Sequence, residues 1–402
     1  MKKIFFYLIC FYNILISKEI KIVSSPENVN VYTNDVKVGV TPVKINFSSP
    51  AELKLEKQGY KTFKILISTN EASNKLFVRM LPTNSHFVFV KQLNCGYSPK
   101  DTIFSPDGRY IIISLLDENG IQLYDLKENK MIKIEIPEYG KRKGFVEGVF
   151  NRDGSEFWFN QMDTEGRVYV LNMKELKITH IIPTKGNWSK VGEFSPDYKY
   201  YYVTSWLSDE VSVIDAEKYS LITKFKTTSQ EPRGVNFSLD GRYVYVVTYK
   251  GGEIIKYDIS NNYTIVKRIK TGGTNGRFRI DYKRELAYIN NMALSSIFVY
   301  DLKQDKIIKT IKTGTNPNNL KITPDGIYLF VSNRGPNNPK GYLYRSPIDG
   351  QIQIFDIEQD YKLVENLKVG NQPIGIAISP DGKLLAISNY MDHNIEIYEI
   401  LL

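Results

Sequence analysis

The stretch Ser105-Pro106-Asp107-Gly108 decides the fold, because the same four-residue pattern returns six more times along the chain. The later copies begin at residues 151, 195, 238, 281, 323 and 379, so neighbouring copies lie 42 to 46 residues apart, except the last, which follows after 56. A period of about 40–45 residues with several short strands in each unit is typical of a β-propeller blade. A single blade cannot bury both faces of its sheet, so we expect the seven repeats to stack in a ring.

Each unit has the same order of predicted strands around its turn. In the first unit, an apolar run at residues 102–104 leads into the turn, and an alternating strand follows at residues 110–114. A third strand ends near an acidic residue at 123–125, and a more charged fourth strand closes the unit, as at 306–311 in the fifth. Proline presets φ, aspartate accepts local backbone hydrogen bonds and glycine permits a positive φ, as this turn requires. The sequence therefore predicts an all-β fold whose main part is a seven-bladed β-propeller.

The strands at the two ends of the repeats predict how the ring closes. The seventh unit stops at Leu402, directly after its third strand, whereas residues 87–93 match an outermost strand with no unit ahead of them. We expect residues 87–93 to complete the seventh blade, because this pairing removes an open sheet edge that would invite aggregation. An open solenoid is the alternative. The propeller is predicted to span residues 84–402.

The repeats resemble those of the YVTN family of seven-bladed, WD40-like propellers. The family pattern runs from G-x-x-P through SPDG to V-S-N, and residues 313–333 and 369–389 hold the nearest copies of it. The second and fifth units depart from the pattern, with Arg152 in place of proline and Asp281-Tyr282-Lys283 in the turn. The resemblance covers about residues 84–402, and it implies an extracytoplasmic or surface protein from a largely non-catalytic family.

A second unit, at residues 18–83, precedes the propeller. Hydrophobic and polar positions alternate in it, and Gly39-Val-Thr-Pro42 and Gly59-Tyr60 mark turns. This pattern resembles the PEGA domain, a small β-sandwich of surface-layer and envelope proteins, although the name-giving tetrapeptide reads Pro26-Glu-Asn-Val29 here. The resemblance implies a spacer or anchoring module without chemistry of its own.

Residues 1–17 are predicted to be a signal peptide. Lys2 and Lys3 supply the positive start, and residues 4–16 form an apolar run too short to span a bilayer comfortably. Cleavage after Ser17 is expected; a lipoprotein attached through Cys10 is the alternative. We therefore expect an exported protein of the periplasm or cell surface, with peripheral association to the envelope.

The charge of the chain favours an acidic partner. The net charge is +9 and the sequence pI is about 9.1, so an exported chain of this balance attracts acidic polymers and lipid headgroups. No nucleic-acid-binding module is recognisable, so nucleic acid is not an expected partner. Once Cys10 has left with the signal, Cys95 stands alone, which excludes an intramolecular disulfide. We expect a monomer.

Known catalytic motifs are absent from the sequence. His86, His180 and His393 lie far apart without metal-ligand spacing, and no H-E-x-x-H, C-x-x-C, P-loop, G-x-S-x-G or G-x-G-x-x-G motif occurs. The aspartates that recur in the turns are structural, since each blade needs its turn. No cofactor, metal or catalytic residue is therefore predicted.

The loops at one opening of the ring form the predicted binding face. In an antiparallel blade, the loop that enters the inner strand and the loop between the second and third strands emerge on the same side. These loops, with an insertion at residues 333–350, carry arginine, lysine and aromatic side chains of the kind that anchor interfaces. The alternative is that they are ordinary solvated loops. The predicted partner-binding residues are Lys100, Trp188, Lys190, Trp206, Arg233, Tyr249, Arg277, Tyr342, Tyr344, Arg345 and Tyr390.

Two classes of function stay open at this point. The first is a non-enzymatic binding or scaffold protein whose propeller face holds a protein or an acidic polysaccharide, either as an adhesin for extracellular matrix or host protein or as a cell-envelope component. The second is a lactonase-like enzyme that acts at the mouth of the propeller channel. A deep site with convergent ionisable groups would indicate the enzyme, and a broad basic and aromatic face would indicate the binder.

Overall fold

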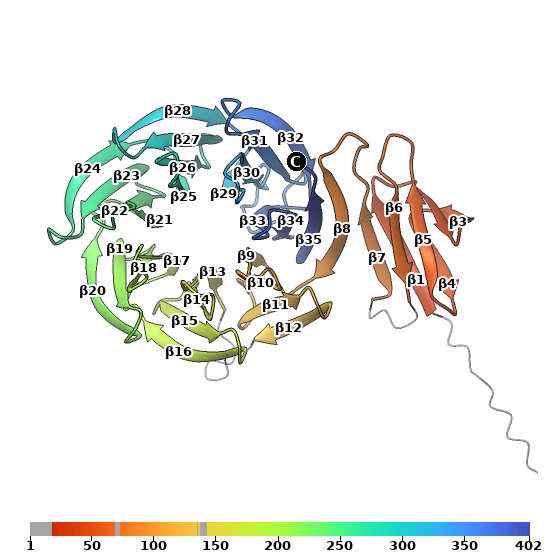
Figure 1. The fold of residues 1–402 in the computed structure, drawn as a ribbon, viewed down its shortest axis with the longest axis horizontal. Helices are drawn as coiled ribbons and strands as arrows, with labels where there is room; N and C mark the ends of the chain where they lie inside the picture. Colours follow the sequence, from red (N-terminus) through yellow and green to blue (C-terminus); the bar gives the residue numbers. More distant parts are fainter. Residues whose placement is uncertain (1–17, 69–72, 135, 137–142) are drawn as a thin grey trace, which may run out of the picture. The chain divides into compact units, whose positions relative to one another are not determined.

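A computed structural model describes residues 18–68, 73–134, 136 and 143–402, and all regular structure within them is β-strand. The predicted signal peptide, residues 1–17, lies outside the described residues. No helix in the described part of the chain is long and apolar enough to cross a membrane. The chain forms two compact units, Met1–Gln92 and Leu93–Leu402 (Figure 1).

The first unit consists of two sheets. One has the strand order β4-β1-β7 and the other β3-β2-β5-β6. The alternation read from the sequence sets the core, since β5 buries Ala51, Leu53 and Leu55 and leaves the residues between them partly exposed. The strands are β1 (Lys18–Ser25), β2 (Asn30–Thr33), β3 (Val36–Val40), β4 (Val43–Phe47), β5 (Ala51–Glu56), β6 (Phe63–Ile67) and β7 (Lys75–Arg79).

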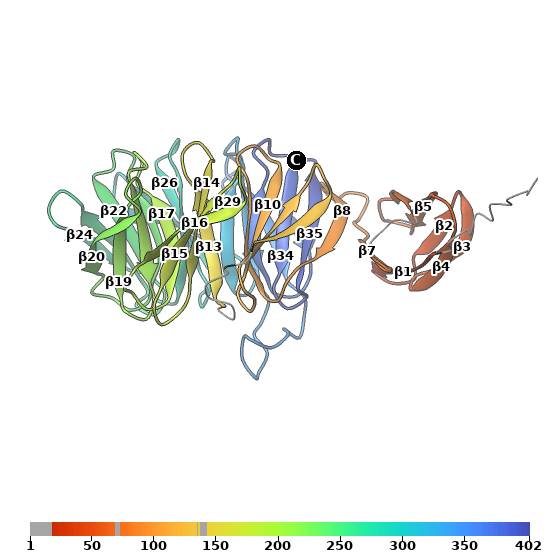
Figure 2. The ribbon, with the colours of Figure 1, turned by 90° about the horizontal axis from the view of Figure 1, so that it is seen from below.

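Seven four-stranded antiparallel sheets follow and stand in a ring (Figures 1 and 2). From inner to outer strand, the first three blades are β9 (Pro99–Phe104), β10 (Tyr110–Leu115), β11 (Ile121–Asp125) and β12 (Lys130–Ile134); β13 (Phe145–Phe150), β14 (Glu156–Gln161), β15 (Arg167–Asn172) and β16 (Lys177–Pro183); and β17 (Ser189–Phe194), β18 (Tyr200–Ser205), β19 (Glu210–Asp215) and β20 (Ser220–Lys226). The next three are β21 (Pro232–Phe237), β22 (Tyr243–Thr248), β23 (Glu253–Asp258) and β24 (Thr264–Lys270); β25 (Asn275–Asp281), β26 (Leu286–Asn291), β27 (Ser296–Asp301) and β28 (Lys306–Lys312); and β29 (Pro317–Ile322), β30 (Tyr328–Asn333), β31 (Gln351–Asp356) and β32 (Lys362–Lys368).

The seventh blade combines strands from both ends of the repeat region. Its order is β33 (Pro373–Ile378), β34 (Leu384–Asn389), β35 (Asn394–Ile400) and β8 (Phe87–Asn94). The outer strand of the last blade therefore comes before the first blade in the sequence. The division between the two compact units falls after Gln92, inside β8.

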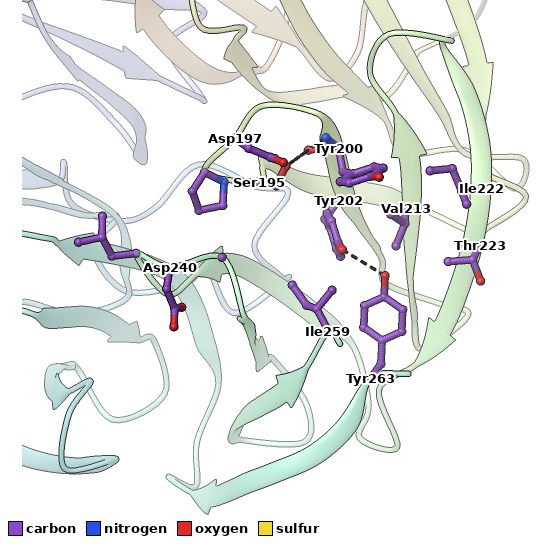
Figure 3. A pocket seen from close by; sticks show the side chains of 13 residues that line it. Ser195, Asp197, Tyr200, Tyr202, Val213, Ile222, Thr223, Asp240, Ile259 and Tyr263 are labelled. Atoms are coloured by element: carbon purple, nitrogen blue, oxygen red, sulfur yellow. Dashed lines mark hydrogen bonds between the residues drawn. The ribbon is translucent and has the colours of Figure 1, made fainter. Parts of the chain in front are cut away.

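The recurring turns are held by the same short hydrogen bonds in several blades. In the third blade, the Ser195 hydroxyl donates to Asp197 Oδ1 at 2.6 Å, and the Lys199 amide donates to the same oxygen at 3.1 Å (Figure 3). The Ser238–Asp240 and Ser379–Asp381 pairs repeat the hydroxyl bond at 2.6 Å. These aspartates serve the turn, as the sequence indicates.

Neighbouring turns also interlock around the ring. A Cβ atom on Gly154 would lie 3.0 Å from the ring of Pro106 in the preceding blade, so the glycine makes room for that proline. The second blade has Arg152 instead of proline, and the third has Tyr198, with φ 63°, instead of glycine. The guanidinium carbon of Arg152 lies 5.1 Å from the centroid of the Tyr198 ring, so a cation–π pair replaces the proline–glycine contact. The proline–glycine contact also joins Pro196 to Gly241, Pro324 to Gly382 and Pro380 to Gly108.

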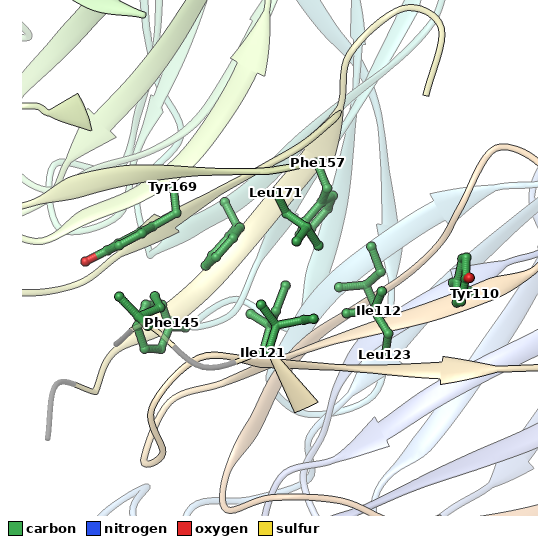
Figure 4. Packing of buried hydrophobic residues seen from close by; sticks show 11 residues of the cluster. Tyr110, Ile112, Ile121, Leu123, Phe145, Phe157, Tyr169 and Leu171 are labelled. Carbon is green, nitrogen blue, oxygen red and sulfur yellow. The ribbon is translucent and has the colours of Figure 1, made fainter. Parts of the chain in front are cut away.

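Aromatic side chains fill the core between the first two blades (Figure 4). The ring of Phe145 lies 5.9 Å from that of Phe159 and 5.5 Å from that of Tyr169, measured between centroids. All three side chains are fully buried, and each such aromatic pair contributes about 0.5–1.5 kcal/mol beyond the burial of its area. This packing holds β13, β14 and β15 of the second blade together, on the side that faces the first blade.

Candidate binding site at the channel mouth

Every inner strand begins with a shift in its pairing register. In the first blade, Pro99 pairs with Leu115 and Asp101 with Ser114, so the ladder skips Lys100. The fourth blade skips Arg233 in the same way. A β-bulge of this kind re-aims side chains and breaks their strict alternation. The residues that the ladders skip in the second, third and fifth blades include Glu147, Lys190 and Arg277.

The bulges gather buried charges at the end of the ring where the inner strands begin, which we call the mouth. The mouth cluster consists of Lys100, Asp101, Glu147, Lys190, Arg233, Arg277 and Arg334, drawn from six blades, and all of them are buried. An Arg277 nitrogen lies 3.0 Å from Glu147 Oε1 and 3.5 Å from Asp101 Oδ2. Five cations thus share two carboxylates.

Burial and mutual repulsion shift the pKa values in the cluster. Burial opposes the ionisation of Glu147, but the cations around it, Arg277 first among them, outweigh that effect and lower its pKa. Burial lowers the pKa of Lys100 to about 7, against the attraction of Glu147 and helped by the arginines nearby. Burial also takes the pKa of Lys190 well below its ordinary value. These shifts reduce the charge that the two lysines carry at neutral pH, so the three arginines supply most of the positive charge at the mouth.

Several buried N–H groups at the mouth have no acceptor within the described part of the chain. They are Nε of Arg233, Arg277 and Arg334 and the indole Nε1 of Trp206. One Arg233 nitrogen contacts the sulfur of Met292, a weak acceptor, at 3.4 Å. A buried donor without a partner costs about 1–3 kcal/mol. An oxygen-rich anion would satisfy these donors, whereas Glu147 Oε2, which has no partner among the described residues either, would need a donor from the ligand.

Aromatic rings cover the cations of the cluster. The ammonium of Lys190 lies 3.3 Å from the ring centroid of Trp206, and this ring is 5.2 Å from that of Tyr249. Such rings attract cations through their electron-rich faces. Similar pairs join Lys100 to Tyr390 at 5.3 Å, Arg233 to Tyr249 at 5.4 Å and Arg334 to Tyr342 at 5.4 Å.

The structure brings most of the predicted binding residues together. Lys100, Trp188, Lys190, Trp206, Arg233, Tyr249, Arg277, Tyr342 and Tyr390 belong to the mouth cluster or contact its aromatic cover. Two predicted residues lie apart from it. Arg345 pairs with Asp349 and Asp392, and Tyr344 is exposed on the insertion, which projects from one face of the ring (Figure 2).

The cations lie on strands, whereas the sequence places them on loops. The inner strands begin earlier than their apolar runs suggest. Their second or third residues are therefore the cations Lys100, Lys190, Arg233 and Arg277. Arg334 was not predicted. A second, partly buried group of charges was also missed. It consists of Glu193, Arg279 and Lys321, each two residues before the turn of its own blade, and Arg279 and Glu193 pair at 3.5 Å. The period of two along a strand is the signal that could have revealed it.

A metal cluster and a reactive thiol are both absent from the part of the chain that the structure describes. That part contains no group of three or more His, Cys, Asp or Glu side chains able to hold a metal ion. Burial raises the pKa of the Cys95 thiol, so this cysteine stays protonated at neutral pH.

Comparisons with known proteins agree with the fold. The family described as "Lactonase, 7-bladed beta-propeller" matches residues 102–274 and 286–401, and the PEGA domain matches residues 17–82. Antigen Lp49 of Leptospira interrogans is 31% identical over 356 residues, which cover 86% of this chain and 77% of the relative. A 6-phosphogluconolactonase of Formosa agariphila is 22% identical over 347 residues, 83% of each chain.

A solved structure shares the propeller architecture. Hydrazine Synthase of Kuenenia stuttgartiensis superposes with a TM-score of 0.61 at 17% identity, over 78% of this chain and 97% of that one, a likeness of fold alone. The predicted resemblance to seven-bladed propellers and to PEGA domains is confirmed. The chain therefore belongs to the family of seven-bladed lactonase β-propellers and carries a PEGA domain ahead of its propeller.

Proposed function

We propose that the protein is an exported, non-enzymatic binding protein whose propeller mouth holds an acidic group of a macromolecular partner. The observation that carries this proposal is the mouth cluster, in which five buried basic side chains share two carboxylates and four buried N–H groups lack an acceptor among the described residues. A carboxylate or a sulfate ester supplies charge and acceptors together, and charge-assisted hydrogen bonds of this kind are about twice as strong as neutral ones.

Exposed apolar side chains around the mouth support a macromolecular partner over a free anion. They stand on loops that open on the same side as the cluster: Tyr97, Leu207, Leu294, Tyr342, Leu343 and Tyr344. Large exposed apolar residues around a polar centre are typical of protein interaction surfaces. A protein or an acidic polysaccharide fits this combination.

The relatives support an exported location. A protein named an antigen, as the Leptospira relative is, is one that an immune system encounters. PEGA domains occur in surface-layer and envelope proteins, and residues 1–17 read as a signal peptide. We therefore propose that the chain lies in the cell envelope, where it acts either as an adhesin or as an envelope component.

Replacing Arg233 and Arg334 together by methionine is expected to weaken binding to heparin, a sulfated polysaccharide, by more than tenfold. Methionine keeps much of the apolar volume but removes both positive charges and their unpaired donors. Surface plasmon resonance on the mature chain measures the loss, and added salt should weaken the wild type as well.

The control replaces Lys306 and Lys362, which are exposed on the outer strands β28 and β32, by methionine. This pair removes the same charge away from the mouth and should leave heparin binding within about twofold. Equal losses from the two pairs would mean diffuse charge attraction without a site.

A second candidate function is hydrolysis of a lactone ring at the same mouth. The lowered pKa of Lys100, about 7, favours it, as does the family to which the chain belongs. The neutral amine would take a proton from water, and the resulting hydroxide would add to the lactone carbonyl. The ring C–O bond would then break as the ammonium returns the proton to the departing ring oxygen, which leaves a hydroxy acid. The arginines of the cluster would stabilise the oxyanion.

The lactonase candidate predicts an activity that rises with pH through about 7, since only the neutral amine of Lys100 accepts the proton. Hydrolysis of 6-phosphogluconolactone, corrected for the buffer reaction, measures it. Lys100→Met should lower the rate by about 10²–10⁴-fold, the usual contribution of a general base, and Lys306→Met should not change it. A wild-type rate no faster than buffer at pH 8 would eliminate this candidate.

A further inference from the structure

Residues of the third and fourth blades line a groove (Figure 3), and none of them belongs to the mouth cluster. It has a volume of about 600 Å³. The turns at residues 195–197 and 239–241 line it, and these turns follow the far ends of β17 and β21, whose first residues form the mouth. The groove therefore opens toward the opposite side of the ring.

The inner wall of the groove is rigid. The hydroxyls of Tyr202 and Tyr263 lie 3.1 Å apart (Figure 3). Tyr263 stacks on Phe225 at 4.2 Å, and Tyr202 meets Phe237 edge to face at 4.8 Å, both measured between ring centroids. Since these rings are held in place, the groove is formed before any partner arrives, and binding to a preformed groove loses less entropy.

The rim of the groove exposes large apolar side chains. Leu239 stands where four of the seven turns have proline, yet it is 68% exposed. Ile222, on the outer strand β20, is 52% exposed, and Tyr200 is 38% exposed. Pro106 and Pro196 each pack on the glycine that ends the turn of the next blade. The turn after that of Leu239 ends in Arg284 instead, so Leu239 has no such glycine to pack on. Exposed apolar rims on rigid scaffolds mark surfaces that another molecule covers.

The groove is acidic although the chain carries a net charge of +9. Its lining includes Asp197 and Asp240 and no lysine or arginine. Both turn bonds of each carboxylate end on Oδ1, which leaves Oδ2 available to a donor from outside. The hydroxyl of Ser238 lowers the pKa of Asp240, so this carboxylate is ionised at neutral pH. Such a groove selects a cation beside an apolar group.

We propose that this groove binds an extended segment of a partner protein, with an apolar side chain in the groove and a neighbouring lysine or arginine paired with Asp197 or Asp240. The volume fits one or two side chains, and the two carboxylates select against the acidic ligands that suit the mouth. The proposal does not depend on the function of the mouth. Together the two sites would let the ring hold an acidic and a basic partner on opposite sides.

Fluorescence anisotropy with the mature full-length chain tests the proposal. The probe is a fluorescein-labelled peptide, Gly-Phe-Lys-Leu-Lys-Gly, and its matched acidic form is Gly-Phe-Glu-Leu-Glu-Gly. The basic peptide should bind with a Kd below about 1 mM and the acidic one at least tenfold more weakly. Ile222→Arg and Asp240→Asn should each weaken the basic peptide at least tenfold; asparagine keeps the Oδ1 acceptor of the turn.

Ile308→Arg is the matched control, because Ile308 is a comparably exposed isoleucine on the outer strand β28 of the fifth blade. It should not change peptide binding, and heparin binding should survive in all three variants. Equal affinity for the two peptides, an equal loss in Ile308→Arg, or no binding of the basic peptide at about 1 mM would overturn the proposal. Binding of cellobiose in place of the basic peptide would overturn it in favour of a saccharide site.

Discussion

A chain that lacks residues 84–93 is expected to lose the cooperative unfolding transition of its whole propeller. The deletion removes nearly all of β8, the outer strand of the seventh sheet, and leaves β35 with an unpaired edge. It also removes the link from the last blade to β9 of the first. Blades contact only their neighbours, so an opened ring exposes two blade faces at once. Differential scanning calorimetry should show a broad transition at lower temperature in place of the single peak.

An equally long deletion elsewhere provides the control. Residues 336–345 belong to the insertion between β30 and β31, contribute no strand and are mostly exposed. Their removal should leave the main transition within a few degrees, since loop shortening costs little. An unchanged transition in the chain that lacks residues 84–93 would mean that the ring closes without β8.

Glu147→Gln is expected to lower the free energy of unfolding by about 3–5 kcal/mol, the usual cost of removing one partner from a buried ion pair. Glu147 is the carboxylate nearest to Arg277, at 3.0 Å, and the buried cations around it lower its pKa. Glutamine keeps the shape but leaves those cations with Asp101 alone. Urea denaturation at pH 6, where Lys100 is protonated, measures the loss.

Glu399→Gln is the matched control, because Glu399 is exposed on β35. Its effect should stay within about 0.5 kcal/mol, as for most surface substitutions. Sulfate should stabilise the Glu147→Gln variant more than the Glu399→Gln variant, since only Glu147→Gln removes an anion that pairs with buried cations. A loss below about 1 kcal/mol in Glu147→Gln would show that the mouth does not need its carboxylates.

The fold could be read from the sequence because its signals are local and repeated. Each copy of the turn pairs proline, aspartate and glycine with a fixed backbone shape, and the spacing of the copies counts the blades. Residues 87–93 stand out as a strand without a unit, and β8 is the outer strand of the seventh sheet.

The chemistry of the mouth could be read only in part. Residue type places Lys100 and Arg233 on the correct end of the ring but on loops, because a β-bulge leaves no mark in the sequence. Their burial depends on side chains of other blades, such as the rings of Tyr390 and Tyr249. Arg334 lies at the start of an insertion that has no counterpart in other units, so no repeat position points to it.

The interlocked turns make the packing of each blade depend on the turn residues of its neighbour. The second residue of one turn meets the fourth residue of the next, as Pro106 meets Gly154 and Arg152 meets Tyr198. A proline at residue 152 would face a tyrosine ring instead of a glycine, so replacing Arg152 alone would remove the cation–π pair without rebuilding the proline–glycine contact. Duplicating or exchanging a blade would therefore place one member of a matched pair of turn residues against an unmatched neighbour. The order of the blades, as well as their number, is then a requirement of the packing.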